Sequence, residues 1–421
     1  MNANEVNKNY IHEKSSLHPL VWILLVGVLL ARMGTSLSVP FITLFLHEKV
    51  GLSLLHTGFI VSLSFISYVI GGFIGGTLSD RYGRARLIIG SLFIFSMIFF
   101  AFGYLGKVIH TPTLLGITFA FLNLILGVTR AWSETLSQAL IADLTHADQK
   151  RKAFSLRYTA ANIGAAIGPF IGGILGFSGS MAGFYLTGCL LFLYFCIYCF
   201  AIYTHRETIQ FHDAKSSLVT FKKAFDVLRR DRKMTYFVLG VLLVYFGFVQ
   251  QESSFAIIIL KYTHSTHIFS LLLSMNAIMV ILLQMPIVKL LEKQSPLRNM
   301  MVGAILVSLG LVVVAMARDH RWMYFVAEFI LTLGEILVFP FNGIVIDSLA
   351  PDSMRGTYFG AAGFQFLGRA LGPIFAGFLI QSMGYSSMLI LIAIIELLSV
   401  LCFYQGYKEM TQNTLEISLA N

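Results

Sequence analysis

Six of the ionisable side chains within long apolar stretches of this 421-residue sequence are candidates for chemistry at membrane depth, and they are the first clue to its function. They are Glu134, Glu252, Glu335, Arg32, Arg130 and Arg369. A carboxyl group can take up and release a proton, whereas a guanidinium group stays charged. Three acids and three arginines can balance one another, so ion pairing and proton exchange in an apolar setting are the expected chemistry.

Proton exchange is expected to rest on the carboxyls, with Glu134 preferred, then Glu335 and then Glu252. Glu134 follows Arg130 by four residues, a spacing that places both side chains on one face of a helix. For each acid, the alternative is a static ion pair that fixes helix packing. Glu252 has a further alternative, a position at the outer end of a helix in contact with water.

Other polar side chains in the apolar stretches are candidates to line a central cavity together with Arg369. They are Asn162, Gln250, Gln251, Asn276 and Asn342. The sequence has no glycine-rich phosphate-binding loop, so ATP is not expected as the energy source. No cofactor or metal is predicted, because the Cys196-x-x-Cys199 pair has no polar neighbours and is expected to pack among apolar groups.

The elements that carry these residues are expected to be membrane-spanning helices. The sequence is 57% hydrophobic and 12% charged, and its apolar runs are long enough for the roughly 20 residues that cross a bilayer. The alternating pattern of a membrane barrel is absent. Twelve helices are predicted, approximately over 19–46, 55–79, 87–107, 112–142, 154–177, 182–204, 234–262, 267–291, 299–317, 321–346, 357–380 and 384–407.

The placement of Lys and Arg predicts how the chain is oriented. Most of the 30 basic residues fall in segments that face the cytoplasm if both termini are inside, as the positive-inside rule requires. The anionic inner leaflet then explains the net charge of +9 without nucleic acid. The first helix is expected to be retained, because no cleavage site follows the polar residues 1–18.

Two halves of the sequence repeat one design. Residues 141–173 align without a gap with residues 345–377 at an offset of 204, with coincident Gly, Pro, Asp and Arg. Residues 27–34 match residues 240–247 at an offset of 213. The repeat predicts an N-terminal six-helix bundle over 1–204, a linker over 205–233 and a C-terminal six-helix bundle over 234–421. The basic linker is expected either to lie on the inner membrane face as a helix or to be a flexible connection.

The loop after the second predicted helix concentrates charge between two apolar runs. Its notable residues are Gly76, Asp80, Arg81, Gly83, Arg84 and Arg86, in the stretch GGTLSDRYGRAR. A basic turn that obeys the positive-inside rule would explain the arginines but neither Asp80 nor the glycines. This pattern resembles the loop signature of the major facilitator superfamily, and the resemblance covers essentially the whole chain.

The resemblance implies a conformational latch on the cytoplasmic side. Asp80 would dock at the N-terminus of the eleventh helix near Arg355, and Arg84 would lie between Asp80 and Asp143. The latch would hold the cytoplasmic side closed in one state and break in the other. The two glycines of the signature would permit close backbone approach and a tight turn.

Small residues recur along the fifth predicted helix. They are Gly164, Gly168, Pro169, Gly172 and Gly173. They resemble the signature of the drug:proton antiporter branches of the superfamily, which supports export. Close helix packing is the alternative explanation, because the eleventh helix carries a partial copy.

The resemblance implies an all-α transporter, not an enzyme, whose two pseudo-symmetric six-helix bundles rock around a central site. The expected function is proton-coupled efflux of small apolar or cationic compounds. One alternative is a symporter or facilitator that imports a metabolite such as a sugar, peptide or siderophore, and another is a receptor that transports nothing. The expected partners are a small-molecule substrate, protons and the lipid bilayer. The protein is expected in the plasma membrane, which is the inner membrane of a Gram-negative cell, and is expected to be a monomer.

Overall fold

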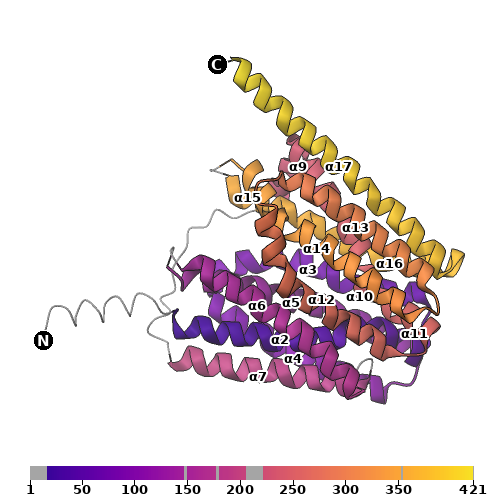
Figure 1. Ribbon diagram of the computed structural model, residues 1–421. Helices are drawn as coiled ribbons and strands as arrows, with labels where there is room; N and C mark the ends of the chain where they lie inside the picture. Colours follow the sequence, from indigo (N-terminus) through magenta and orange to yellow (C-terminus); the bar gives the residue numbers. More distant parts are fainter. Residues whose placement is uncertain (1–16, 147–148, 177–179, 205–220, 352–353, 421) are drawn as a thin grey trace, which may run out of the picture.

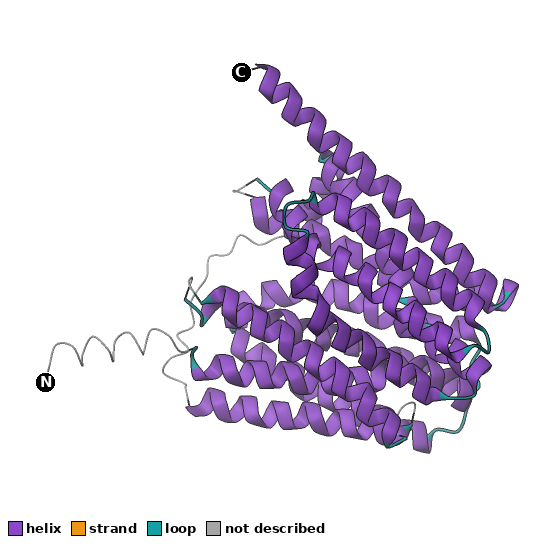
Figure 2. Cartoon of the chain, viewed as in Figure 1, coloured by secondary structure: helices purple, strands orange, loops and turns teal. Residues whose placement is uncertain are grey.

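The computed structural model describes residues 17–146, 149–176, 180–204, 221–351 and 354–420, and within these ranges every regular element is helical (Figures 1 and 2). The N-terminal bundle contains α2 (Pro19–Leu44), a π-helical turn η1 (Phe45–Lys49), α3 (Leu54–Tyr82), α4 (Arg84–Val108), α5 (Pro112–Asp143), α6 (Lys150–Ile174) and α7 (Met181–Thr204). A short helix α8 (Phe221–Arg230) precedes the second bundle. The C-terminal bundle contains α9 (Arg232–Phe248), α10 (Gln250–Ser253), α11 (Phe255–Thr263), α12 (Thr266–Leu290), α13 (Pro296–Ala317), α14 (Arg321–Leu349), α15 (Arg355–Ala362), a 3-10 turn η3 (Gly363–Phe366), α16 (Leu367–Met383) and α17 (Tyr385–Ala420).

Eleven helices among the described residues are long and apolar enough to cross a membrane. The helix α6 is equally long at 25 residues but less apolar, because it begins with three basic residues and contains Arg157. Since α6 packs along α2 and α12, it completes the predicted set of twelve. The predicted linker over 205–233 lies partly outside the described residues, so its limits stay a prediction.

Each bundle has its own apolar core. In the N-terminal bundle, the rings of Phe102 and Phe119 stack with their centroids 4.5 Å apart, and Phe184 packs beside them. In the C-terminal bundle, α13 lies between α14 and α17 and buries Met300 and Val307 completely. The packed aromatic and aliphatic side chains fix the helices of each bundle against one another.

The glycines of α6 and α16 show that the sequence repeat is also a repeat in packing. A Cβ atom at Gly164 would overlap the carbonyl oxygen of Leu29 in α2, and one at Gly368 would overlap that of Leu242 in α9. Gly368 follows Gly164 by 204 residues, and Leu242 follows Leu29 by 213 residues. These are the two offsets of the sequence repeat. The predicted pseudo-symmetry is therefore confirmed, and close packing accounts for Gly164 and for Gly168, which lies against the same helix α2.

The remaining residues of the glycine-rich signature lie toward the end of α6. Pro169 is inside the helix, as Pro373 is inside α16, and Gly172 is buried. Gly173 lies against Ser270 of α12, which belongs to the other bundle. This end of α6 therefore forms part of the contact between the bundles.

The two bundles are packed tightly at the end opposite the chain termini. There, a Cβ atom at Gly58 of α3 would overlap the carbonyl oxygen of Pro373, and one at Gly377 would overlap that of Leu54. The rings of Phe41 and Phe269 meet edge to face with centroids 5.2 Å apart. Figure 1 shows the two sets of helices close together at this end and diverging toward the end that carries both termini. The structure is therefore closed on the side of the loop at residues 50–53.

Candidate functional site

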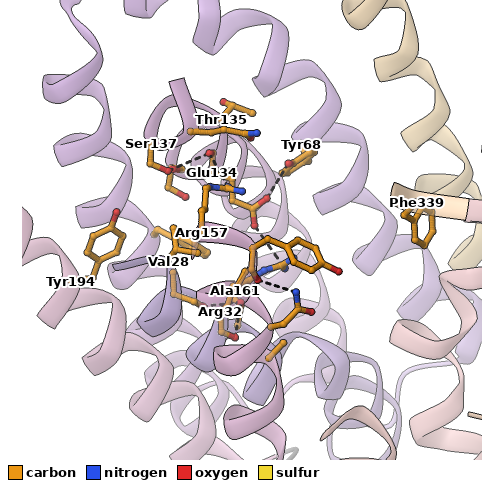
Figure 3. A pocket seen from close by; sticks show the side chains of 18 of the residues that line it. Val28, Arg32, Tyr68, Glu134, Thr135, Ser137, Arg157, Ala161, Tyr194 and Phe339 are labelled. Carbon is orange, nitrogen blue, oxygen red and sulfur yellow. Dashed lines mark hydrogen bonds and ion pairs between the residues drawn. The ribbon is translucent and has the colours of Figure 1, made fainter. Parts of the chain in front are cut away.

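A cavity of about 350 Å³ lies between the bundles, where the ionisable residues of the spans converge. Helices α2, α3, α5 and α6 form most of its wall, and α14 closes it from the other bundle with Glu335 and Phe339. Figure 3 shows Glu134 among Arg32, Arg157 and Tyr68, with Phe339 on the far side. Its polar lining includes Arg32, Tyr68, Glu134, Gln138, Arg157, Tyr158 and Asn162.

Glu134 is the centre of the charge cluster on the N-terminal side. Arg130 Nε donates to Glu134 Oε1 at 3.2 Å, as their spacing of four on α5 predicts. Tyr68 Oη of α3 donates to Glu134 Oε2 at 3.0 Å, and Arg32 Nη1 of α2 lies 4.0 Å from Oε1. Both carboxylate oxygens therefore already accept a hydrogen bond from the protein.

Arg157 belongs to this cluster although the sequence-based charge balance left it out. Its Nη2 donates to the Glu134 backbone carbonyl oxygen at 3.5 Å, and its Nε is buried without a hydrogen-bond partner in the described part of the chain. In the sequence, Arg157 could have been found by its place in the fifth predicted helix, five residues before Asn162, which also lines the cavity.

A second cavity of about 200 Å³ shares Arg32, Tyr68 and Glu134 with the first. Arg369 of α16 lines it, donates to Glu252 Oε1 and lies 5.3 Å from the centre of the Phe65 ring. The pair with Arg369 places Glu252 inside the protein, with a side chain 26% exposed, and not at a wet helix end. The break between α9 and α11 brings Glu252 to this position.

Glu335 is the carboxyl of the first cavity that has no cationic partner. Asn276 Nδ2 of α12 donates to Glu335 Oε2 at 2.6 Å and also lies 3.0 Å from Thr332 Oγ1. No Lys or Arg nitrogen forms an ion pair with Glu335 among the described residues. Its partners are neutral groups, in contrast to those of Glu134.

Two further carboxyls lie inside the C-terminal bundle, so the prediction of three membrane acids is wrong. Glu328 is 1% exposed and accepts a hydrogen bond from Gln251, and Glu396 is fully buried and accepts one from Ser308. Glu328 precedes Glu335 by seven residues, about two helical turns, which places both on one face of α14. That spacing was the signal by which the sequence could have revealed Glu328.

Most residues predicted to line the substrate cavity do not line either cavity described above. Gln250 bonds within its own helix segment, Gln251 bonds Glu328, and Asn342 donates to Gln365 at 3.0 Å. These three amides are buried, with partners inside the C-terminal bundle. Asn276 also lines neither cavity, whereas Asn162 lines the first and Arg369 the second. The hydrogen bonds of the three amides are made largely within the bundle, and the role of the cavity residues in substrate binding stays a prediction.

Comparison with known proteins decides the family. The sequence profile of the Major Facilitator Superfamily matches residues 24–366 and 253–416. The chain belongs to the major facilitator superfamily. The superfamily assignment agrees with the helical fold, and the chain is a multi-pass membrane transporter of the kind its relatives represent.

Several members of the superfamily resemble the chain over most of its length. An uncharacterized MFS-type transporter, YqjV of Bacillus subtilis, is 28% identical, and the match covers 94% of this chain and 96% of that protein. A Na(+), Li(+), K(+)/H(+) antiporter of Planococcus maritimus is 25% identical over 83% and 87% of the two chains. The quinolone resistance protein NorA of Staphylococcus aureus (strain MRSA252) is 24% identical over 85% and 89%. Among solved structures, the nucleoside transporter NupG has the same fold, with a TM-score of 0.76, 14% identity and coverage of 93% and 100%.

The loop signature of the superfamily lies between α3 and α4. Gly83 separates the two helices with a φ of 85°, a conformation that glycine adopts without strain. Arg84 pairs with Asp143 at the end of α5, and the side chain of Arg86 is exposed. The side chains of Gly76, Asp80, Arg81 and Arg355 lie outside the described residues, so the docking of Asp80 stays a prediction.

Proposed function

We propose that this transporter is a proton-coupled exporter of small organic compounds, in which Glu335 carries the proton. The observation that supports this proposal is the contrast between the two cavity carboxyls. Glu134 accepts hydrogen bonds from Arg130 and Tyr68 near Arg32, whereas Glu335 accepts one from the neutral Asn276.

A guanidinium group favours the charged form of a neighbouring carboxyl, while a neutral amide can bond either form. Proton uptake at Glu134 would therefore leave three arginines without a counter-ion. Proton uptake at Glu335 would leave no such imbalance. The charged groups that act on Glu335 are Glu328 on its own helix, Glu252 of α10, Arg369 of α16, and Arg32 across the cavity. We therefore place Glu335 before Glu134 as the proton carrier.

The arrangement of the bundles supports transport by alternating access. The side of the loop at residues 50–53 is closed in this structure by the contacts of α3 with α16 and of α6 with α12. Rocking of the bundles would open these contacts and close the opposite side, where Asp80 and Arg84 would complete the latch. We assign that opposite side to the cytoplasm, with both termini there and a monomer in the plasma membrane.

The names of two relatives support antiport over import. One is an antiporter that uses H(+), and the other is a quinolone resistance protein. The alternative is import of a metabolite by proton symport. The direction of the proton gradient that drives transport separates the two.

The test uses everted membrane vesicles that contain this protein, with labelled norfloxacin outside as the probe. An imposed gradient that is acid inside should drive accumulation of norfloxacin, because antiport exchanges it for outward-moving protons. Glu335→Gln, which mimics the protonated acid, should reduce the gradient-driven component at least tenfold. Glu396→Gln is the matched control, because it neutralises a buried carboxyl outside both cavities.

Three outcomes would contradict the proposal. Accumulation driven by a gradient that is acid outside would show symport, and uptake that ignores the gradient would show a facilitator. Loss of gradient-driven uptake in Glu134→Gln with Glu335→Gln unaffected would move the coupling site to α5.

A further inference from the structure

We infer that Arg32 and Arg157 form a binding subsite for a carboxylate group of the transported compound. The inference rests on the proposed transport function but not on its proton coupling. The sequence led us to expect apolar or cationic substrates. We now expect organic acids, including zwitterions. The observations that carry the inference are the unused donors of the two arginines in the wall of the larger cavity.

The first observation is that the arginines outnumber the acid they surround. Arg32, Arg130 and Arg157 converge on Glu134, whose two carboxylate oxygens accept from Arg130 and Tyr68. The cluster therefore keeps an excess positive charge next to the cavity. A cationic ligand would be repelled by this wall, and an anionic ligand would be attracted.

The second observation concerns the donors that remain unused. Arg32 Nη1 is 4.0 Å from Glu134 Oε1, too far for a hydrogen bond, and the Arg32 side chain is 44% exposed. Among the described residues, Arg157 Nε is buried with no partner, and the one hydrogen bond of this side chain is a long one from Nη2 to a backbone carbonyl. A buried donor without an acceptor is unfavourable, and a carboxylate in the cavity would supply the acceptor.

The third observation is the shape and lining of the cavity. Both arginines line it, and Figure 3 shows them on the same side as Glu134. A guanidinium group matches a carboxylate with two parallel hydrogen bonds, which is why we assign this anion rather than a halide. The volume of about 350 Å³ suits a small organic molecule, whose apolar part would contact Val28, Ala161 and Phe339.

Glu335 limits the class of acid further. It faces the same cavity from the opposite bundle and would repel a second carboxylate when it is ionised. A monocarboxylate whose other end is apolar or basic is compatible both with the arginines and with Glu335. A dicarboxylate is not.

The test measures binding to the purified protein in detergent at pH 7 by calorimetry, without any gradient. The probes are 3-(2-naphthyl)propanoate, its primary amide and 3-(2-naphthyl)propylamine, which share one aromatic body and differ in charge. We expect the acid to bind at least tenfold more tightly than the amide and the amine. Arg157→Gln and Arg32→Gln should each weaken binding of the acid at least tenfold and leave the affinity for the amide unchanged.

Two further variants make the result interpretable. Arg157→Lys keeps the charge but loses the buried Nε, so it should recover only part of the acid's affinity. Arg229→Gln on the exposed face of α8 is the control and should bind all three probes like the wild type. If Arg157→Gln does not fold, Arg32→Gln decides, because the Arg32 side chain is 44% exposed and makes no hydrogen bond among the described residues.

The inference is overturned if the acid binds no more tightly than its amide, or if both Gln variants leave acid binding intact. Either result would leave the vesicle experiment unaffected, since gradient-driven uptake does not depend on the anion subsite being correct. Conversely, gradient-independent uptake with preserved acid selectivity would reject proton coupling and keep the subsite.

Discussion

The two bundles present walls of opposite charge to one another. On the N-terminal side, Arg32, Arg130 and Arg157 surround Glu134 at the cavity. On the C-terminal side, Glu335 faces the first cavity and Glu252 pairs with Arg369, while Glu328 and Glu396 are buried inside the bundle. Two halves that share a backbone design have therefore acquired different chemistry. We interpret the first wall as the one that recognises a charged substrate and the second as the one that exchanges a proton.

The partners of the acids explain why the two walls should behave differently. Glu134 is held by cations and a phenol, so its charge is needed to keep the arginines together. Glu335, Glu328 and Glu396 bond Asn276, Gln251 and Ser308, which are neutral. Removing the charge of Glu134 should therefore be costly, whereas removing that of Glu335 should cost little.

The largest effect is expected from Glu134→Gln. This change leaves three arginines close together without their counter-ion, so it should lower the stability of the purified protein by about 3 kcal/mol. The measurement is the midpoint of thermal unfolding in detergent, with Glu335→Gln as the matched change in the other wall. Glu335→Gln should cost less than about 1 kcal/mol, the scale of one neutral hydrogen bond. Equal destabilisation by the two variants would remove the distinction between the walls.

A smaller effect is expected from the ion pair that joins α10 to α16. Arg369→Gln and Glu252→Gln should each destabilise the protein, because each leaves the other charge unpaired in a half-buried site. The double variant should be less destabilised than the sum by about 1–2 kcal/mol. Thermal unfolding of all four proteins gives this coupling energy. Additive effects would show that Glu252 and Arg369 contribute independently and that the second wall holds no fixed ion pair.

The smallest effect is expected from Tyr68→Phe. It removes the hydrogen bond of 3.0 Å to Glu134 Oε2 and should cost about 1 kcal/mol. Tyr245→Phe is the control, because Tyr245 stacks on Phe339 at 4.8 Å and has no hydrogen bond from its hydroxyl among the described residues. A loss of similar size in both variants would mean that the Tyr68 hydroxyl does not help to hold Glu134.

The sequence by itself determined the features that depend on local spacing and on average polarity. Hydropathy predicts the spanning helices, the offsets of 204 and 213 predict the repeated packing of Gly164 and Gly368, and the spacing of four predicts the Arg130–Glu134 pair. These features need no knowledge of how one helix is rotated against another. For that reason they could be predicted without the structure.

Only the tertiary structure decided which distant side chains meet. Tyr68 reaches Glu134 across 66 residues, and Asn276 reaches Glu335 across 59. Gln251 bonds Glu328 and does not line either cavity. Arg157 lies in the cluster around Glu134, although the charge balance drawn from the sequence did not include it. The physical reason is that the rotation of each helix about its axis is set by close packing of its small residues against neighbouring backbones. Hydropathy averaged along a span contains no information on that rotation.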